Sequence, residues 1–476
     1  MARSSTDVLC ERPSLRDEMA TGDLRDDRLN ARRNQLIAIL EQSPDKGFPE
    51  ACASDADTEA LYRFLRNRRV SPAAVLEPHV AATAARCGAL GEVLVIHDTT
   101  EMAFACEQPR RGLTSLGMHR QGFWWHAALA VSAEGVRAPL GLLTAAAYSR
   151  APTRVPRVPW RERFQDPRKE SRRWADGVAT VRARLGDTVR PIHVMDREGD
   201  SYELLAALTA AQDRWIIRLH YDRQVTHAAG SAALRLGELR SQLPVLMTEP
   251  VTVAPRRAEN RVQRLTAPAR EGRVATVSFA ASPVTVPCPR DHRRSTLPAT
   301  VTAHVIFGWE ATPPAGDAPV AWWLLTNEPI DTVDQVRQIV QWYRTRWLIE
   351  EFFKCLKTGC AYEKRQLESL DTLLVALALL APIAWQLLLM RHLARDLPER
   401  DATVALTTRQ LMILRATPVG RTLPARPSIR DALLAVARLG GHLRQNGEPG
   451  WLVLTRGMQT LRCMETGWAA AEAAHK

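Results

Sequence analysis

The chain has 476 residues, 46% of them hydrophobic, which is enough to bury the cores of roughly two to four domains. It carries 64 Lys and Arg against 52 Asp and Glu, and the net charge of +12 favours a polyanionic partner such as nucleic acid; a basic enzyme without nucleic acid and a membrane-surface protein are the alternatives. The eight cysteines include no Cys-x-x-Cys, which argues against a zinc site or a disulfide framework, and the charged N-terminus lacks an apolar signal core.

Residues 1 to 72 are predicted to form a basic, helical N-terminal domain. Apolar residues recur at helical spacing between Leu29 and Leu40, and the segment 61–69 places four arginines around an apolar seam. We predict that Arg63 and Arg66 in this segment contact DNA phosphates. A solvated helix face is the alternative interpretation of the same pattern.

Residues 73 to 391 are predicted to form an α/β domain. The apolar run 92–96 indicates a strand that is buried on both faces and ends at Asp98. Further strands are expected at 123–130, 135–148, 190–195 and 215–219, and a short helix at 202–211. Strands and helices in this order indicate a mixed α/β sheet. We include Arg218, in the strand at 215–219, among the predicted DNA contacts.

Residues 222 to 320 differ in composition and are predicted to be a β-rich insertion in the α/β domain. They are rich in Pro, Thr, Val and Arg and show no helical period. Their arginines outnumber their acids, which would suit a DNA contact surface, although a charged, solvated sheet edge is an ordinary alternative. A strand at 320–329 and a helix at 332–357 are expected to follow.

The segment 372–390 is apolar and long enough to span a membrane. Because Pro382 and Gln386 interrupt it and no second such segment exists, we predict a buried core helix and no membrane association. From 392 to 476 the chain is predicted to form a helical C-terminal region, including a helix at 431–443.

Three carboxylates are the candidate catalytic residues. Asp98 and Asp196 each follow an apolar strand, where an ionised carboxylate is costly unless a cation compensates it. A turn-capping role is the alternative for either aspartate alone. Of the acids that follow the strand at 190–195, we select Asp196 because it lies directly at the strand end; Glu198 and Asp200 are expected to be cap or surface residues.

The third carboxylate, Glu350, belongs to an aligned set. At about 100° per residue, Tyr343, Arg346, Glu350 and Lys357 fall on one stripe of the predicted helix, opposite its apolar side. A polar solvated face is the alternative. Two Asp and one Glu could hold two Mg²⁺ ions about 4 Å apart, with Mn²⁺ able to substitute, while Arg346 and the lysine bind phosphates.

The Tyr-Arg-Glu-Lys spacing resembles the signature of insertion-sequence transposases. The segment 343–359 is similar to the Tn-five branch of the IS-four group of bacterial DDE transposases. Similar matches run in the same order along nearly the whole chain. They lie at 62–67, Asp98-Thr-Thr, Asp196-Arg-Glu, 322–329 and 437–441.

This resemblance implies an RNase H-like catalytic core with an inserted β subdomain. It assigns the catalytic and metal-binding roles to Asp98, Asp196 and Glu350, and DNA contacts to Tyr343, Arg346 and Lys357. It also places Trp322 at a base-stacking position, facing away from Trp323 in the strand. The implied activity is cut-and-paste transposition: nicking, hairpin formation, hairpin opening and joining of the 3′ ends to target DNA.

The resemblance further implies double-stranded DNA partners, namely transposon ends bound by residues 1–72 and target DNA. It also implies a homodimer in the DNA complex, with residues 392–476 as the dimerisation region. We expect a cytoplasmic bacterial protein that is associated with the nucleoid when bound to DNA. Two other functions stay open: an RNase H-like nuclease without strand transfer, and a catalytically silent DNA-binding repressor. The presence of all three acids argues against the second.

Overall fold

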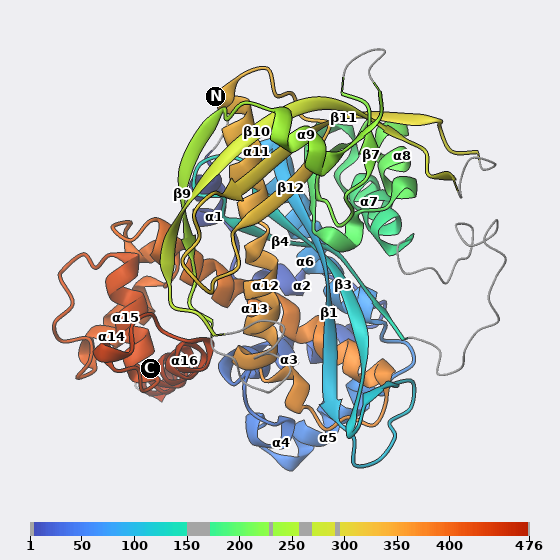
Figure 1. Cartoon of the computed structure of the whole chain (residues 1–476). Coiled ribbons are helices and arrows are strands. Elements are labelled where there is room, and N and C mark those ends of the chain that lie inside the picture. The colour runs from blue at the N-terminus through green and yellow to red at the C-terminus, as the bar shows by residue number, and fades with distance from the viewer. Residues whose placement is uncertain (1–3, 150–171, 228–231, 257–268, 291–295, 475–476) are drawn as a thin grey trace. The chain divides into compact units, whose positions relative to one another are not determined.

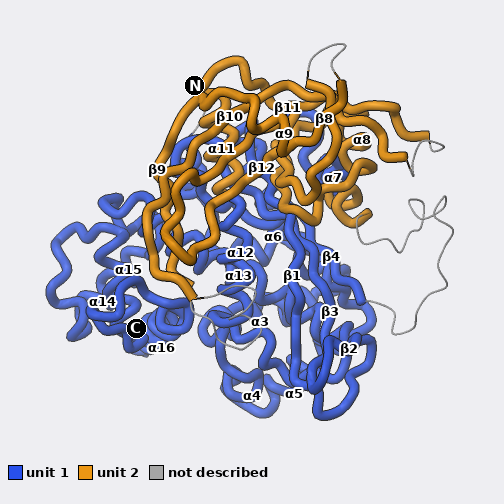
Figure 2. The backbone as a smooth tube through the Cα atoms, viewed as in Figure 1, with its two compact units in different colours: residues 1–156, 179–190, 346–476 blue, residues 157–178, 191–345 orange. Residues whose placement is uncertain are grey.

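The computed structural model describes the whole chain except residues 1–3, 150–171, 228–231, 257–268, 291–295 and 475–476 (Figure 1). The chain divides into two compact units (Figure 2). Unit 1 comprises residues 1–156, 179–190 and 346–476, and unit 2 comprises residues 157–178 and 191–345. The chain passes between the units after residue 156, within helix α7 (Arg172–Leu185), after Arg190 and after Thr345.

Unit 1 begins with the predicted N-terminal helices. They are α1 (Ser5–Cys10), α2 (Leu15–Ala20), α3 (Asp27–Gln42), α4 (Phe48–Ala51), α5 (Asp55–Leu65) and α6 (Pro72–Leu90). Their starts follow from side-chain caps: Asp26 accepts hydrogen bonds from two backbone N–H groups of α3, and Ser54 and Ser71 cap α5 and α6. Leu36 and Leu40 of α3 are fully buried, so the helical period seen in the sequence forms a real core face.

Four antiparallel strands follow in unit 1. They are β1 (Glu92–Ala105), β2 (Thr114–Gly117), β3 (Arg120–Ser132) and β4 (Pro139–Tyr148). Strand β1 does not end at Asp98 as expected, because it pairs with β3 from Val93 opposite Ser132 to Ala105 opposite Arg120. Asp98 therefore lies in the middle of a strand, opposite Ala127.

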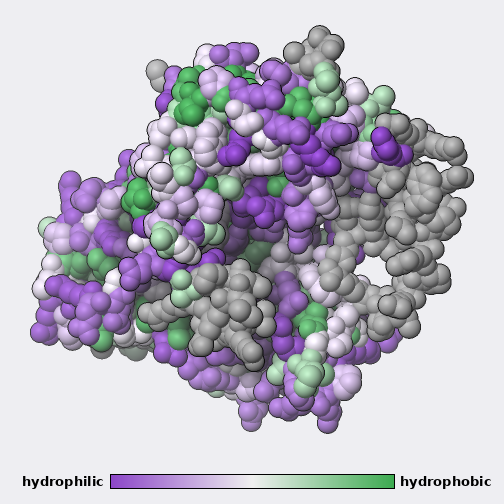
Figure 3. Space-filling view, viewed as in Figure 1, coloured by the Kyte–Doolittle hydropathy of each residue, from purple (hydrophilic) through white to green (hydrophobic). Residues whose placement is uncertain are grey.

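Helix α13 (Leu370–Asp396) is the predicted core helix. Among the described residues it alone is long and apolar enough to cross a membrane, but 89% of its most apolar window is buried inside the protein. It packs against α6, β4, α3 and the C-terminal helix α15 (Ile429–Leu439), and Trp385 Nε1 donates to the Pro139 carbonyl at 3.0 Å. The surface drawn in Figure 3 is, by contrast, mostly hydrophilic.

The C-terminal region is helical, as predicted. It contains α14 (Thr408–Ala416), α15 (Ile429–Leu439) and α16 (Trp451–Ala474), with short 3-10 turns at Ala402–Val404 and Arg444–Asn446. Helices α15 and α16 approach so closely that only glycine fits at two positions. A Cβ atom on Gly457 would lie 1.8 Å from the Val436 carbonyl oxygen, and one on Gly440 would lie 1.9 Å from that of Val453.

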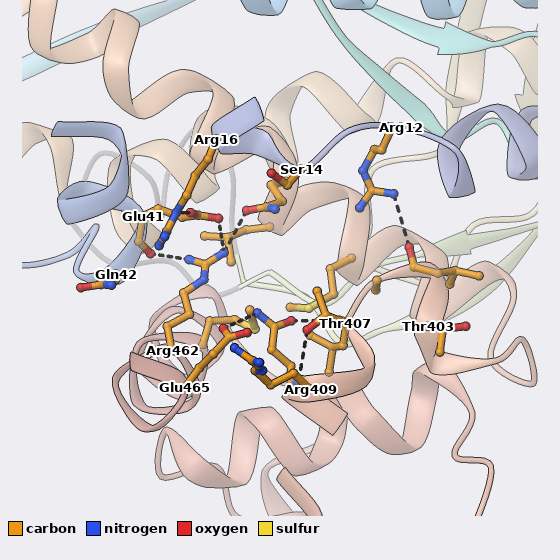
Figure 4. A pocket seen from close by; sticks show the side chains of 18 of the residues that line it. Arg12, Ser14, Arg16, Glu41, Gln42, Thr403, Thr407, Arg409, Arg462 and Glu465 are labelled. Carbon is orange, nitrogen blue, oxygen red and sulfur yellow. Dashed lines mark hydrogen bonds and ion pairs between the residues drawn. The ribbon is translucent and has the colours of Figure 1, made fainter. Parts of the chain in front are cut away.

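The N-terminal and C-terminal helices of unit 1 meet around a cavity of about 620 Å³ (Figure 4). Glu41 of α3 joins the two sides. It accepts hydrogen bonds from Arg16 Nε and from Arg462 Nη2 of α16, each at 2.9 Å. Burial lowers the pKa of Arg462, and the Glu41 carboxylate opposes that shift. The first and last helices of the chain therefore share one packed body.

Unit 2 contains the parallel β-α-β part of the fold and the β-rich insertion. Its strands are β5 (Arg190–Met195), β6 (Arg214–Arg218), β7 (Gln224–Val225), β8 (Leu234–Arg235), β9 (Met247–Val253), β10 (Arg273–Pro287), β11 (Thr300–Glu310) and β12 (Ala321–Thr326). Strands β5 and β6 are parallel and joined by α8 (Tyr202–Ala210), and β12, β11, β10 and β9 continue the sheet antiparallel. This confirms a mixed α/β fold with an RNase H-like core and a β-rich insertion.

The insertion differs from the prediction in one element and in the role of one arginine. A short helix, α9 (Leu236–Gln242), interrupts it, with Leu236 and Leu239 fully buried. Arg273, one of the arginines considered for DNA contact, pairs with Glu310 and with Asp317 at 2.9 Å. Its charge is therefore engaged inside unit 2. Three parts of the insertion, 228–231, 257–268 and 291–295, lie outside the described residues.

Candidate active site

The signature helix is interrupted. One helix was expected from 332 to 357, but α11 (Val333–Arg344) ends with Thr345 as its C-cap, and α12 (Trp347–Lys354) begins after Arg346. The Thr345 N–H donates to both the Gln341 and Trp342 carbonyls, at 3.3 and 3.1 Å, which tightens the last turn of α11. A π-helical turn, Cys355–Gly359, follows α12. Tyr343 thus belongs to α11, and Lys357 lies beyond α12.

Within unit 1, the structure brings Asp98, Arg346 and Glu350 together. Arg346 Nη1 donates to Asp98 Oδ2 at 3.0 Å, and Arg346 Nη2 donates to Glu350 Oε1. The Thr99 N–H donates to the other Asp98 oxygen, Oδ1, at 2.7 Å. The Arg346 and Asp98 side chains are each 13% exposed, and that of Glu350 is 34% exposed. Two predicted catalytic carboxylates therefore converge on one cation.

Lys357 contacts β1, the strand that carries Asp98, three residues further along at Glu101. Its Nζ donates to the Glu101 carbonyl at 2.6 Å and lies 3.6 Å from Glu363 Oε1. The same Glu363 oxygen accepts the Ala103 N–H at 2.9 Å, which fixes the carboxylate against β1. The sequence did not point to Glu363, because no spacing rule links it to a lysine six residues earlier. We infer that Glu363 positions Lys357.

Asp196 lies in unit 2, where it directly follows β5 as predicted. It also caps the next turn, since its Oδ1 accepts the Glu198 N–H at 2.8 Å. Asp200 is not the cap or surface residue that was expected. Its carboxylate is buried, accepts the His220 N–H at 2.7 Å and pairs with Arg223. The structure thus gives Asp200 a structural role within unit 2.

The described residues contain no group of three His, Cys, Asp or Glu side chains placed to hold a metal ion. The donor chemistry of Asp98 and Glu350 nevertheless fits a hard cation. Both offer carboxylate oxygens, and both already bind the same positive charge of Arg346. These two residues therefore form the metal-compatible part of unit 1.

In unit 2, the predicted base-stacking residue lies beside the signature tyrosine. The ring centroids of Trp322 and Tyr343 are 6.4 Å apart, and the ring of Phe279, on β10, lies 6.3 Å from that of Trp322. Trp323 points to the other face and packs edge-on against Phe307 at 5.4 Å, in the core of unit 2. Arg218 of β6 donates to the Ala321 carbonyl at 3.1 Å, next to Trp322.

The two predicted N-terminal DNA contacts are exposed. Arg63 lies 3.6 Å from Glu59 with 71% of its side chain exposed, a pair that is weak in water. Arg66 lies over the Tyr62 ring and 3.4 Å from Glu368. It lines a cavity of about 1100 Å³ whose wall also carries further cationic and polar side chains, including Arg68, Asn67 and Arg111.

Two family models match the chain. Residues 12–70 match a transposase DNA-binding domain, and residues 168–385 match the transposase DDE domain. The chain belongs to the DDE transposases. The matched segments of this transposase include Arg63, Arg66, Asp196 and Glu350, whereas Asp98 lies between them.

Among solved structures, the transposase is similar to one described as a cryo-EM structure of the piggyBac transposase synaptic complex with hairpin DNA. The identity is 8%, and the similarity covers 82% of this chain and 75% of the other. The TM-score is 0.35.

The exposure of Arg63 and Arg66 leads to a prediction about salt dependence. Replacing both with Gln in the transposase should flatten the slope of log affinity for end DNA against log salt by about 0.9 for each phosphate that the protein no longer neutralises. The matched control is Arg184→Gln, whose arginine pairs with Glu77 on α6. Gel shifts over a salt series measure the slope, and an unchanged slope in the double variant would mean that these arginines only solvate their helix.

Proposed function

We propose that this transposase moves DNA by a cut-and-paste reaction of the IS-four type. In this proposal it binds the ends of its element, nicks each end, forms and opens a hairpin, and joins the 3′ ends to target DNA. The observation that carries the proposal is that Asp98 and Glu350 both pair with the guanidinium of Arg346. Asp98 and Arg346 are 248 residues apart in the chain. A merely solvated helix face would not bring these groups together.

Asp98, Asp196 and Glu350 are proposed to hold two Mg²⁺ ions, for which Mn²⁺ can substitute. When bound, these ions would supply Lewis acidity at phosphorus and would neutralise charge on the entering and leaving oxygens. Arg346 and Lys357 bind the phosphates, the arginine with its two-pronged guanidinium and the lysine as a point charge. Tyr343 and Arg218 contact the DNA backbone.

The aromatic side chains of unit 2 are proposed to help in hairpin formation. Tight bending of DNA unstacks a base, and an aromatic face compensates by roughly 1–3 kcal/mol per base. Trp322 is partly exposed and has Tyr343 beside it, so it can receive a flipped base, whereas Trp323 packs into the core of unit 2.

The domain limits proposed for this reaction are 1–72, 73–391 with the insertion 222–320, and 392–476.

Substituting the two tryptophans should separate these roles. Trp322→Ala should still nick but should accumulate nicked DNA, because its hairpin step should slow by roughly 5- to 150-fold if 1–3 kcal/mol of stacking is removed. Trp323→Ala should mainly lower the melting temperature. Gel analysis of nicked and hairpin products, with thermal melts, measures both. Exchanged phenotypes would assign the stacking role to Trp323, and normal hairpin formation by both variants would remove it from this strand.

An excision assay tests the proposed function as a whole. Purified protein is incubated with a linear DNA in which a marker lies between the inverted repeats that flank the coding sequence, with Mg²⁺ or with EDTA. We expect excised, joined product only with Mg²⁺, and light scattering should find two chains in the end complex. Cleavage without joining would indicate a nuclease, and binding without cleavage a repressor. The same protein in bacteria is expected in the cytoplasm, at the nucleoid when bound to DNA.

A further inference from the structure

Arg346 uses both prongs of its guanidinium on the carboxylates that are proposed to bind metal. Nη1 donates to Asp98 at 3.0 Å and Nη2 donates to Glu350, while the Thr99 N–H holds the remaining Asp98 oxygen at 2.7 Å. End-on bidentate binding of a phosphate would use the same two nitrogens. The arginine can therefore serve the carboxylates or a phosphate in this way, but not both at once.

A divalent ion that binds the same carboxylate oxygens would lie beside this guanidinium. The Arg346 and Asp98 side chains are each only 13% exposed, so water screens a second positive charge weakly. Guanidinium and metal therefore repel each other and compete for Asp98 Oδ2 and Glu350 Oε1. Anything that draws the guanidinium away from these oxygens raises the affinity of the carboxylates for metal.

We propose that Arg346 is a latch that couples metal binding to DNA binding, an inference that rests on the proposed function of Asp98 and Glu350. The guanidinium competes with the metal for the two carboxylates and yields them when it moves onto a DNA phosphate. Coupling of this kind is reciprocal, so DNA raises the affinity for metal and metal raises the affinity for DNA. The transposase then binds its metal tightly only when DNA is present.

Lys357 provides the internal comparison. It is the other proposed phosphate-binding cation near β1, but it is held by the Glu101 carbonyl and by Glu363. Neither group is a proposed metal ligand. Moving Lys357 onto a phosphate therefore frees no metal-binding oxygen, and its removal should not change metal affinity through competition.

The test measures Mn²⁺ binding to the full-length, DNA-free protein from the electron paramagnetic resonance signal of free Mn²⁺. Arg346→Gln should bind Mn²⁺ about tenfold more tightly than the wild type, within the usual range for coupled sites. Lys357→Gln, which removes the same charge, should stay within about twofold. Arg346→Lys should fall between, because an ammonium keeps the charge but lacks the fork. Equal or weaker Mn²⁺ binding by Arg346→Gln would overturn the latch.

A second set of Mn²⁺ titrations includes a DNA duplex of about 40 base pairs taken from the end of the element. DNA should raise the Mn²⁺ affinity of the wild type about tenfold and should leave that of Arg346→Gln nearly unchanged. No effect of DNA on the wild type would contradict the coupling. Asp98→Asn and Glu350→Gln locate the ion: unchanged Mn²⁺ binding in both would overturn the proposed metal site itself, whereas its loss together with an inert Arg346→Gln would overturn the latch alone.

Discussion

Alanine at Asp98, Asp196 or Glu350 should abolish Mg²⁺- or Mn²⁺-dependent nicking of end DNA while gel-shift binding persists. Each change removes carboxylate oxygens that a hard cation needs. We expect each rate to fall at least about a hundredfold, which corresponds to roughly 2.7 kcal/mol of barrier. Time courses of nicking on labelled end DNA measure the loss, and EDTA should reproduce it in the wild type.

The matched control for these variants is Glu351→Ala. Glu351 is the next residue on α12, but its carboxylate pairs with Arg395 at 3.2 Å rather than with Arg346. It should therefore nick at nearly the wild-type rate. Full nicking by any one of the three acid variants would remove that residue from the catalytic set and leave the other two to be judged separately.

Glu18→Gln should destabilise the protein by about 3–5 kcal/mol, because it leaves a buried guanidinium without its carboxylate. Glu18 accepts from Arg86 Nη1 and from His79 Nδ1, each at 2.6 Å, and all three side chains are buried. His79 Nε2 accepts the Leu142 N–H at 3.1 Å, so the ring proton lies on Nδ1 and points at Glu18. Arg86 also lies over the Trp385 ring at 4.6 Å. Denaturant unfolding followed by fluorescence measures the change.

Glu77→Gln is the control for this effect, since it breaks the exposed pair between Glu77 and Arg184 of α7. It should cost no more than about 1 kcal/mol. If Glu18→Gln proved equally mild, the buried cluster would not hold α2 against α6.

The same cluster predicts that the protein loses stability on acidification. Burial lowers the pKa of His79 from its usual 6.5, although Glu18 opposes the shift. Burial acts to raise the pKa of Glu18, but its hydrogen bonds and the charges of His79 and Arg86 leave it below 4.5. Each group therefore contributes stability above its unfolded pKa that is lost as pH falls. The unfolding midpoint should begin to drop below about pH 6.5, and a flat midpoint between pH 7 and 5 would contradict this assignment.

Much of the fold could be predicted because the local pattern agrees with the packing. The strand expected at 190–195 is β5 itself, and the apolar segment 372–390 lies inside core helix α13. The limit of β1 could not be predicted. From His97 to Glu101 its residues are polar, and pairing with β3, whose partner residues lie 15 to 31 positions further along the chain, continues the strand to Ala105.

The residues of the candidate site could be predicted from the sequence, but the contacts between them could not. No glycine or proline marks the break at Thr345, so one helix was the natural expectation. The pairing of Arg346 with Asp98 joins residues 248 apart, and no spacing rule reaches that far. The burial of Asp200 depends in the same way on Arg223, which lies on a separate segment of unit 2.

Helix α13 has a consequence for the synthesis of this protein. It is 27 residues long, about 40 Å, and before the chain folds it has the length and apolar character of a membrane segment. Its partners include the π-helical turn Cys355–Gly359 and helix α15, so this part of its cover is missing until α15 has left the ribosome. A gene copy with a stop codon soon after residue 396 would yield this helix uncovered. We expect such remnants to aggregate or to associate with membranes, because the apolar side chains that α15 covers would be exposed.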